Sequence, residues 1–199
     1  MTAPESDAGV HLFFDTETTG LPKNYKAPVS DLKNWPRLIQ VAWLITDDAG
    51  SAVKSVEYII KPDGFVIPPE AAKIHGITHE RADQEGVRLK PVLEEIAADI
   101  AKAKDLIAHN MPFDEKILGA EFLRMGASNH VDAKPRKCTM HSSTDYCRLP
   151  GPYGNKWPKL QELHAKLFQN GFDGAHNALA DVRACSRCYF ELRRLGVMS

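Results

Sequence analysis

Two acidic side chains stand two residues apart where an apolar run ends. They are Asp15 and Glu17, in the stretch FDTETTG. Because alternate residues of a strand point to the same face, both carboxylates would share one spot at the strand's carboxyl end. Two carboxyl groups so close together do not both ionise readily unless a cation neutralises them. Carboxylate oxygens are ligands that suit Mg²⁺ or Mn²⁺. A solvated acidic turn is the alternative, and it is the commoner case for this motif alone.

A third carboxylate, Asp114, ends the stretch HNMPFD at another junction between a strand and a helix. Asn110 is a plausible N-cap there, and Pro112 fits the first helical turn, so Asp114 falls on the opening turn. If the preceding strand neighbours the first one, Asp114 joins the same acidic cluster. An acid that only favours the helix dipole is the alternative.

A histidine and a fourth carboxylate open the last expected helix, in the stretch HNALAD. Asn177 could cap this helix, which places Asp181 in its first turn or so and His176 just outside it. A histidine of near-neutral pKa beside carboxylates suits a general base. Taken alone, a surface histidine without a catalytic role is the commoner case.

The elements that must position these residues follow from hydrophobic periodicity. Residues 21–36 hold three prolines and no apolar period, which predicts a long loop, and such loops tend to be functional. Residues 131–157 are rich in proline and glycine and are expected to be irregular. Paired strands followed by strand–helix alternation predict a mixed α/β sheet covered on both faces. The expected strands are 10–15, 38–46, 53–60 and 105–109, and the expected helices are 89–104, 111–125, 157–168 and 178–195.

Length and composition are those of one globular unit. The chain has 199 residues, 43% of them hydrophobic and 26% charged. We expect a flexible N-terminus over residues 1–8 and a single domain over residues 9–199. The start, MTAPESDAGV, has neither the basic nor the apolar region of a secretory signal, and no apolar run could span a bilayer. We therefore expect a cytoplasmic protein without a membrane partner.

Net charge and cysteine content exclude few classes of function. A net charge of −1 gives no global positive field, so a surface for a polyanion must be local or built with metal ions. Cys185 and Cys188 form a CxxC that could supply half a zinc site, but Cys138 and Cys147 lack the matching spacing. Buried thiols on a helix are the favoured interpretation, and a zinc-dependent interaction domain is the alternative.

The order of the three motifs, FDTETTG, HNMPFD and HNALAD, resembles that of the DEDDh 3'–5' exonucleases. This DnaQ-like family includes the proofreading epsilon subunit of bacterial DNA polymerase III. The stretch IHGIT at residues 74–78 also resembles the family's nucleotide-site turn, and the H-x4-D spacing marks the histidine branch. The resemblance implies a ribonuclease H-like fold with a five-stranded mixed sheet flanked by helices.

The resemblance also implies a mechanism. Two divalent ions, Mg²⁺ or Mn²⁺, would be held by Asp15, Glu17, Asp114 and Asp181. Such a pair can stabilise both the attacking and the leaving oxygen of a phosphoryl transfer. His176 would be the general base, and nucleoside 5'-monophosphates would leave the 3' end of single-stranded DNA one at a time.

Substrate contacts are implied at four further positions. By their place in the family's motifs, Glu70 and His75 resemble residues that meet the terminal sugar and base, and Thr18 and Thr19 are further candidates. An acid at a helix start is an equal alternative for Glu70, because Pro68 and Pro69 precede it.

Two basic stretches that also carry aromatic residues could hold the strand. They are residues 21–37 and 131–166, and we expect them to flank the site. Their basic members are Lys23, Lys26, Lys33, Arg37, Lys134, Arg136, Lys137, Arg148, Lys156 and Lys159, and their aromatic members are Tyr25, Trp35, Tyr146, Tyr153 and Trp157. For any single lysine, a solvated loop is the alternative.

The resemblance to the replicative subunit is incomplete. That subunit carries a further tail that tethers it to its polymerase, whereas this sequence stops at Ser199, and Gln40 and Cys138 stand where acids are usual. We therefore expect a free-standing exonuclease, although polymerase association and a role in proofreading or repair stay open. Two alternatives remain: an exoribonuclease similar to oligoribonuclease or ribonuclease T, and a non-catalytic nucleic-acid-binding module.

Overall fold

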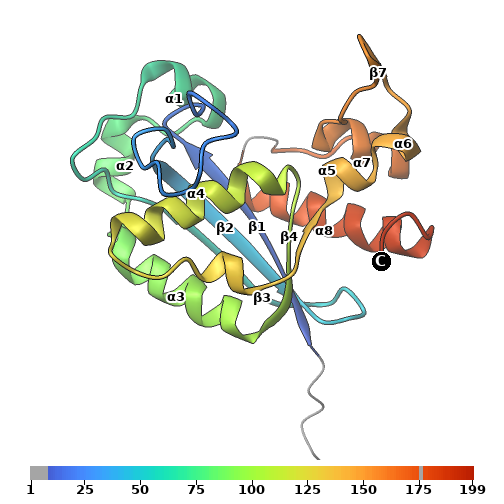
Figure 1. The fold of residues 1–199 in the computed structure, drawn as a ribbon, viewed down its shortest axis with the longest axis horizontal. Helices are drawn as coiled ribbons and strands as arrows, with labels where there is room; N and C mark the ends of the chain where they lie inside the picture. The colour runs from blue at the N-terminus through green and yellow to red at the C-terminus, as the bar shows by residue number, and fades with distance from the viewer. Residues whose placement is uncertain (1–8, 175–176) are drawn as a thin grey trace, which may run out of the picture.

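A five-stranded mixed sheet forms the centre of the computed structural model, which describes residues 9–174 and 177–199 (Figure 1). The strand order is β3-β2-β1-β4-β5; β1 pairs antiparallel with β2 and parallel with β4. This confirms the expected fold class and places β1 and β4 side by side. The strands are β1 (Val10–Thr18), β2 (Leu38–Thr46), β3 (Ala52–Ile59), β4 (Ala103–Ala108) and β5 (Arg136–Cys138).

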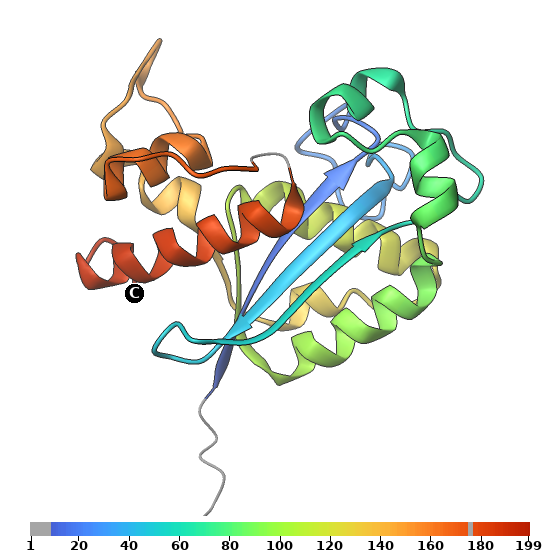
Figure 2. The ribbon, with the colours of Figure 1, turned by 180° about the vertical axis from the view of Figure 1, so that it is seen from behind.

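Helices cover both faces of the sheet, with α3 and α4 on one side and α8 on the other (Figures 1 and 2). A short hairpin, β6 (Pro150–Gly151) and β7 (Gly154–Asn155), projects beyond α6 and α7. The helices are α1 (Pro69–His75), α2 (His79–Glu85), α3 (Leu89–Lys102), α4 (Met111–Arg124), the 3-10 helix η1 (His130–Ala133), α5 (Thr139–Ser142), α6 (Thr144–Cys147), α7 (Leu160–Phe168) and α8 (Ala178–Arg194).

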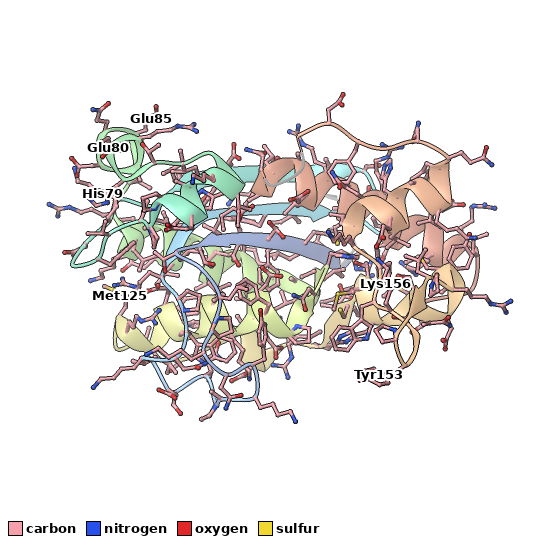
Figure 3. The ribbon with its side chains drawn as sticks, turned by 90° about the horizontal axis from the view of Figure 1, so that it is seen from above. His79, Glu80, Glu85, Met125, Tyr153 and Lys156 are labelled. Atoms are coloured by element: carbon pink, nitrogen blue, oxygen red, sulfur yellow. The ribbon has the colours of Figure 1, made fainter. Side chains whose placement is uncertain are left out.

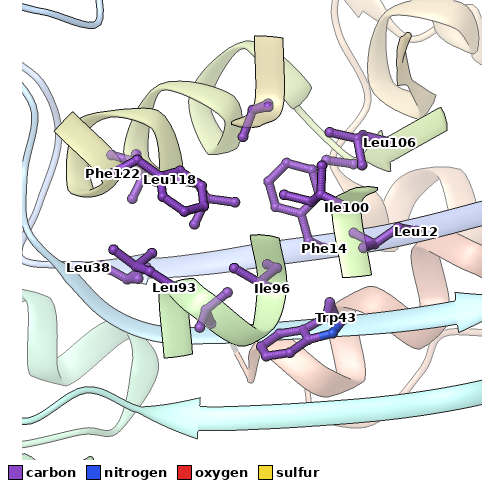
Figure 4. Close-up of a cluster of buried hydrophobic side chains, with 14 of the residues drawn as sticks. Leu12, Phe14, Leu38, Trp43, Leu93, Ile96, Ile100, Leu106, Leu118 and Phe122 are labelled. Atoms are coloured by element: carbon purple, nitrogen blue, oxygen red, sulfur yellow. The ribbon is translucent and has the colours of Figure 1, made fainter. Parts of the chain in front are cut away.

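The alternation of side chains along β1 sorts the core into two parts. Leu12 and Phe14 pack in the larger cluster with Ile96 of α3 and Leu118 of α4 (Figure 4). Phe13 points the opposite way and packs with Val182 and Tyr189 of α8, among others. Residues of β1 with odd numbers therefore face α8, and those with even numbers face α4. This division decides where the acidic side chains of β1 lie.

The predicted strands and helices are present with small shifts in their bounds, but the structure contains further elements. The expectation of an irregular stretch over residues 131–157 is wrong, because this stretch contains β5, which pairs parallel with β4, the short helices α5 and α6, and the β6–β7 hairpin. The helices α1 and α2 had no predicted counterpart. β1 runs through Thr18, so Glu17 lies within a strand rather than at a turn. Residues 1–8, expected to be flexible, lie outside the described part of the chain.

Two details of the helix starts differ from expectation. Asn110 occupies the N-cap position of α4, but its backbone is left-handed (φ 76°) and its side chain makes no capping hydrogen bond. α7 begins at Leu160 rather than at residue 157, because Pro158 disfavours helical backbone in Trp157. No helix in the described ranges combines the length and the apolar character that a bilayer crossing requires.

Candidate active site

Three carboxylates meet where β1 ends beside the first turn of α8. Asp15 and Glu17 have odd numbers on β1 and so face α8, whose first turn carries Asp181. One carboxylate oxygen from each of the three lies within 4.8 Å of the others. The spacing of two along the strand and the packing of α8 on β1 together produce this cluster.

Asp114 reaches the same place from the opposite face of the sheet. It lies in the first turn of α4, where its side chain is only 2% exposed. Thr16, between the two acids of β1, faces α4 and donates to the Oδ1 atom of Asp114 from its backbone N–H (3.1 Å) and its hydroxyl (2.7 Å). Asp114 is thus fixed to β1 itself, and the expected neighbourhood of its strand and the first strand is confirmed.

Mutual repulsion and burial change the acidity of this cluster. Burial, followed by the charges of Asp114, Asp181 and Glu17, raises the pKa of Asp15 well above its usual value. Burial and the same aspartates raise the pKa of Glu17 to about 8. Burial also raises the pKa of Asp114 to about 7, against the opposing hydrogen bonds from Thr16. Clustered oxygen ligands that resist ionisation together fit a site for hard divalent cations.

The start of α8 is held by side chains of two strands. Asn177 caps the helix as expected, since its side chain accepts a hydrogen bond from the backbone N–H of Ala180 (3.0 Å). One oxygen of Glu57, Oε1, accepts from Asn177 Nδ2 (3.0 Å) and from Gln40 Nε2 (3.0 Å). Gln40 Oε1 in turn accepts from the N–H of Ala178 (3.3 Å). The predicted general base, His176, lies outside the described residues.

The two predicted threonine contacts are engaged within the protein. The hydroxyl of Thr18 donates to the carbonyl of Gly20 (2.7 Å). Thr19 Oγ1 accepts from the N–H of Arg37 (2.9 Å), and the N–H of Thr19 donates to the carbonyl of Arg37 (3.0 Å). These bonds fix the turn after β1 and its junction with β2.

His75 and Glu70 lie on α1, but in different surroundings. His75 is buried at the helix end, and its Nδ1 accepts from the N–H of Ile77 (3.2 Å). Burial lowers the pKa of His75, while the backbone carbonyl of Thr18 opposes that shift. The ring lines a cavity of about 270 Å³ together with Gln40 and Asn177.

The position of Glu70 is less informative. It is exposed in the first turn of α1, after two prolines, and it is not among the residues that line the cavity at His75. The geometry therefore brings His75 toward the start of α8, and it leaves both interpretations of Glu70 open.

One functional candidate that sequence reasoning missed is His109. Its Nε2 lies 3.0 Å from the carbonyl of Pro158, and its Nδ1 lies 2.9 Å from Thr139 Oγ1. Burial lowers the pKa of His109 to about 4, so the ring is neutral at pH 7. Because a carbonyl can only accept, Nε2 donates to Pro158 and Nδ1 accepts from Thr139. The ring therefore ties the segment before α7 to the end of β4.

The cysteines behave as core residues. Burial raises the pKa of Cys188 to about 12 and that of Cys185 well above its usual value. Both pack on α8 inside the protein, and all four cysteines are free thiols. The only group of metal-ligating residues found in the described ranges is the carboxylate cluster, which contains no cysteine.

The sequence model of the RNase T family, described as "Exonuclease", matches residues 12–189. The DNA polymerase III subunit epsilon of Treponema pallidum is 35% identical over 184 residues, which cover 88% of this chain and 73% of that protein. The chain belongs to the DnaQ-like 3'–5' exonuclease family. It is therefore a nuclease, an enzyme class whose members hydrolyse phosphodiester bonds and, in this family, depend on divalent metals.

Other comparisons agree. An uncharacterised exonuclease of Escherichia phage 186, CP81, is 27% identical over 180 residues, or 86% of this chain and 82% of the phage protein. The zinc-bound complex of E. coli exonuclease I with single-stranded DNA has the same fold, with a TM-score of 0.72 at 23% identity. That match covers 94% of this chain but 41% of exonuclease I, so it supports the fold alone.

Proposed function

We propose that this enzyme removes nucleoside 5'-monophosphates from the 3' ends of single-stranded DNA. The observation that carries the proposal is the carboxylate cluster of Asp15, Glu17 and Asp181, with Asp114 fixed beside it by Thr16. Related proteins support DNA as the substrate, since one is a DNA polymerase subunit and another was crystallised with single-stranded DNA.

Divalent ions fit this cluster, because four hard carboxylates need positive charge beside them before a phosphate can approach, and the pKa values of Asp15, Glu17 and Asp114 are raised. Asp15, Glu17, Asp114 and Asp181 would hold two such ions, Mg²⁺ or Mn²⁺. When bound, the ions would make water a nucleophile at neutral pH and offset the charge of the leaving oxygen.

The chain's own groups supply orientation and proton transfer. Thr16 keeps Asp114 pointed at the cluster, and the cap of Asn177 fixes the helix turn that carries Asp181. We assign His176, next to that cap in sequence, the role of accepting the proton of the attacking water. A group that accepts this proton near neutral pH must be close to the cluster, which is where α8 begins.

The terminal nucleoside would lie on the α1 side of the cluster. His75 lines the cavity there, and the backbone at Thr18 and Thr19 borders the same end of β1. Glu70 is the candidate for accepting a hydrogen bond from the 3'-hydroxyl.

Two surface segments would hold the rest of the strand. In the first, Lys23, Tyr25 and Lys26 are exposed, but Trp35 is buried and Arg37 pairs with Glu121 (2.9 Å). Those last two therefore cannot stack on bases or bind phosphates freely, contrary to expectation. In the second, Tyr153 extends from the β6–β7 hairpin at the end of the molecule opposite α2, whereas Lys156 beside it pairs with Glu162 (2.6 Å) (Figure 3).

The proposed role is that of a free-standing exonuclease in DNA proofreading or repair, in the cytoplasm. Association with a polymerase is a second arrangement, supported by the relatives named epsilon subunit. We propose a preference for DNA over RNA on the basis of those relatives, not of a contact to a sugar.

The test uses a 5'-labelled DNA strand and a matched RNA strand, each with Mg²⁺ or Mn²⁺. We expect a ladder that shortens from the 3' end on DNA and is lost with Asp15→Asn and with His176→Ala. Asp63→Asn, an exposed carboxylate in the loop before α1, is the matched control and should retain activity. Faster cleavage of RNA would favour an exoribonuclease. Binding without cleavage of either strand would favour a non-catalytic module.

A further inference from the structure

A cavity of about 460 Å³ opens beside Asp181, on the side of the cluster away from α1. Part of its wall is formed by residues that come shortly after β4 and β5 in the sequence. The helix α1 instead comes after β3, which is at the opposite edge of the sheet. The residues that matter for its chemistry are His109, Met140, Trp157, Lys159, Phe172 and Asp181. A carboxylate of the acidic cluster and a largely apolar recess thus share one wall.

Trp157 gives this cavity an exposed aromatic surface. The side chain is 63% exposed, whereas Trp35 and Trp43 are 3% and 0% exposed. Its ring lies against that of His141, with 4.9 Å between centroids and an angle of 48° between planes. An exposed tryptophan is costly to leave in water, and its face is suited to stacking on a flat, apolar ligand.

The cavity is built on anchored segments. The hydrogen bond from His109 to the carbonyl of Pro158 fixes the residue next to Trp157. Phe172 packs edge-on against His164, with 5.2 Å between ring centroids, and His164 Nδ1 bonds the carbonyl of Asn170 (3.0 Å). Both aromatic walls are therefore held in place before any ligand arrives, which lowers the entropic cost of binding.

We propose that this cavity receives the base of the penultimate nucleotide, stacked on Trp157. The inference rests on the proposed function, because it takes the scissile phosphate to lie at the carboxylate cluster. That phosphate joins two nucleosides, and the terminal one is assigned to the α1 side, at His75. The other nucleoside must leave the cluster on the opposite side, where this cavity lies. Lys159 at its wall would meet the next phosphate.

Stacking on an aromatic side chain tolerates every base, since each base has a π face. The cavity therefore predicts a requirement for a base at the penultimate position and little preference among the four. Removing the stacking surface should weaken strand binding about ten-fold.

The experiment measures binding and cleavage of oligothymidylates by the full chain in Mg²⁺. Binding is measured with a strand whose last linkage is a non-hydrolysable methylenephosphonate, and cleavage with the unmodified strand. Strands that lack the base at the terminal, the penultimate or the fourth position from the 3' end are compared. Because Trp157 is the one tryptophan that is not buried, quenching of tryptophan fluorescence reports directly on the cavity.

We expect Trp157→Ala to raise Kd about ten-fold and to lose most of the quenching, while Trp157→Phe keeps near-normal affinity. Val53→Ala, which trims an exposed apolar side chain of β3 that does not line the cavity, is the control. Removal of the penultimate base should weaken binding to the unaltered protein and have no further effect on Trp157→Ala.

Three results would overturn the inference: unchanged affinity of Trp157→Ala, additive losses from Trp157→Ala and the missing penultimate base, or coupling to the terminal base instead. Failure of the unaltered protein to cleave the unmodified strand would refute the proposed function itself. Cleavage without any effect at Trp157 would refute the assignment of the cavity alone.

Discussion

Thr16 and Asp114 are joined by two hydrogen bonds to a single carboxylate oxygen, from the backbone N–H of Thr16 (3.1 Å) and from its hydroxyl (2.7 Å). The two residues are 98 positions apart in sequence, and both are buried. Thr16 lies on the α4 face of β1, between two acids that face α8. One strand therefore contributes two carboxylates directly and orients a third through its neighbour.

Replacing Thr16 by valine should impair catalysis more than folding. The change keeps the volume but removes the hydroxyl that opposes the raised pKa of Asp114. Loss of such a supporting hydrogen bond commonly costs about 10- to 100-fold in metal affinity or activity. We expect a loss of that size in kcat, and a rise in the Mg²⁺ concentration needed for half-maximal activity, measured on a labelled DNA strand.

Thr46 provides the matched control for that experiment. It is fully buried on β2, and its Oγ1 has no hydrogen-bond partner in the described structure. Thr46→Val should leave activity unchanged and should not lower the free energy of unfolding. Thr16→Ser, which keeps the hydroxyl, should recover much of the activity. Equal activity of Thr16→Val and Thr46→Val would show that the hydroxyl is not needed.

Glu57 is expected to act as a positioning residue for the start of α8. Its Oε1 accepts from both Gln40 and Asn177, so Glu57→Ala should loosen the turn that precedes Asp181. We expect kcat to fall about ten-fold with little change in KM, because small displacements of catalytic groups are costly. Glu57→Gln keeps an accepting oxygen and should restore kcat. A similar loss in Glu94→Ala, on the exposed face of α3, would indicate a general effect of lost charge instead.

Local pattern placed Asp15 and Glu17 at a strand end and Asp114 and Asp181 at helix starts, but each motif alone left a non-catalytic alternative open. The order of the three motifs, and its resemblance to the exonuclease family, predicted that these acids share one site. The family resemblance supplied the fifth strand, which periodicity did not. β5 is a three-residue edge strand of Arg136, Lys137 and Cys138 with no apolar alternation, and its pairing with β4 is a tertiary contact.

Side-chain partners at long range could not be predicted. His109 appeared in the sequence only as the residue before a helix cap, yet its neutral ring ties Pro158 to Thr139, because burial excludes the charged form. Trp35 was interpreted as a stacking residue, but the loop folds back on itself and its indole N–H donates to the carbonyl of Pro28 (2.9 Å). Such outcomes depend on which segments pack together, and no local period encodes them.

Lys23 and Lys26 should contribute to strand binding through charge. Both are exposed in the loop after β1, so neutralising them with Lys→Gln changes removes two cations that could meet phosphates. We expect KM for single strands to rise and the slope of log KM against log salt concentration to fall by about 1.4. Lys102→Gln, at the end of α3 where β4 starts, is the control. An unchanged KM for the double variant would exclude this loop from the strand contact.

Without metal, the stability of the folded protein should fall between about pH 5 and pH 8. The pKa values of Asp15, Glu17 and Asp114 are raised, so in this range the folded state holds protons that the unfolded chain has released. These groups therefore make the free energy of unfolding decrease as pH rises. The decrease is complete only above the pKa values that the groups have in the folded state. Chemical denaturation in EDTA should show this decline, and Asp15→Asn should reduce it. An equal decline in both proteins would assign the pH dependence to other groups.

Divalent ions should restore the stability that is lost at high pH, because they bind the ionised carboxylate cluster, which exists only in the folded state. At an ion concentration 100 times Kd the expected stabilisation is about 2.7 kcal/mol. For a chain of this size that corresponds to a rise in Tm of about 5–10 °C. The rise should grow from pH 6 to pH 8 as the cluster ionises, and Asp15→Asn should lose most of it. Thermal unfolding with Mg²⁺ or Mn²⁺ against EDTA measures this directly, and an equal rise in Asp15→Asn would mean that the ions stabilise the protein at another place.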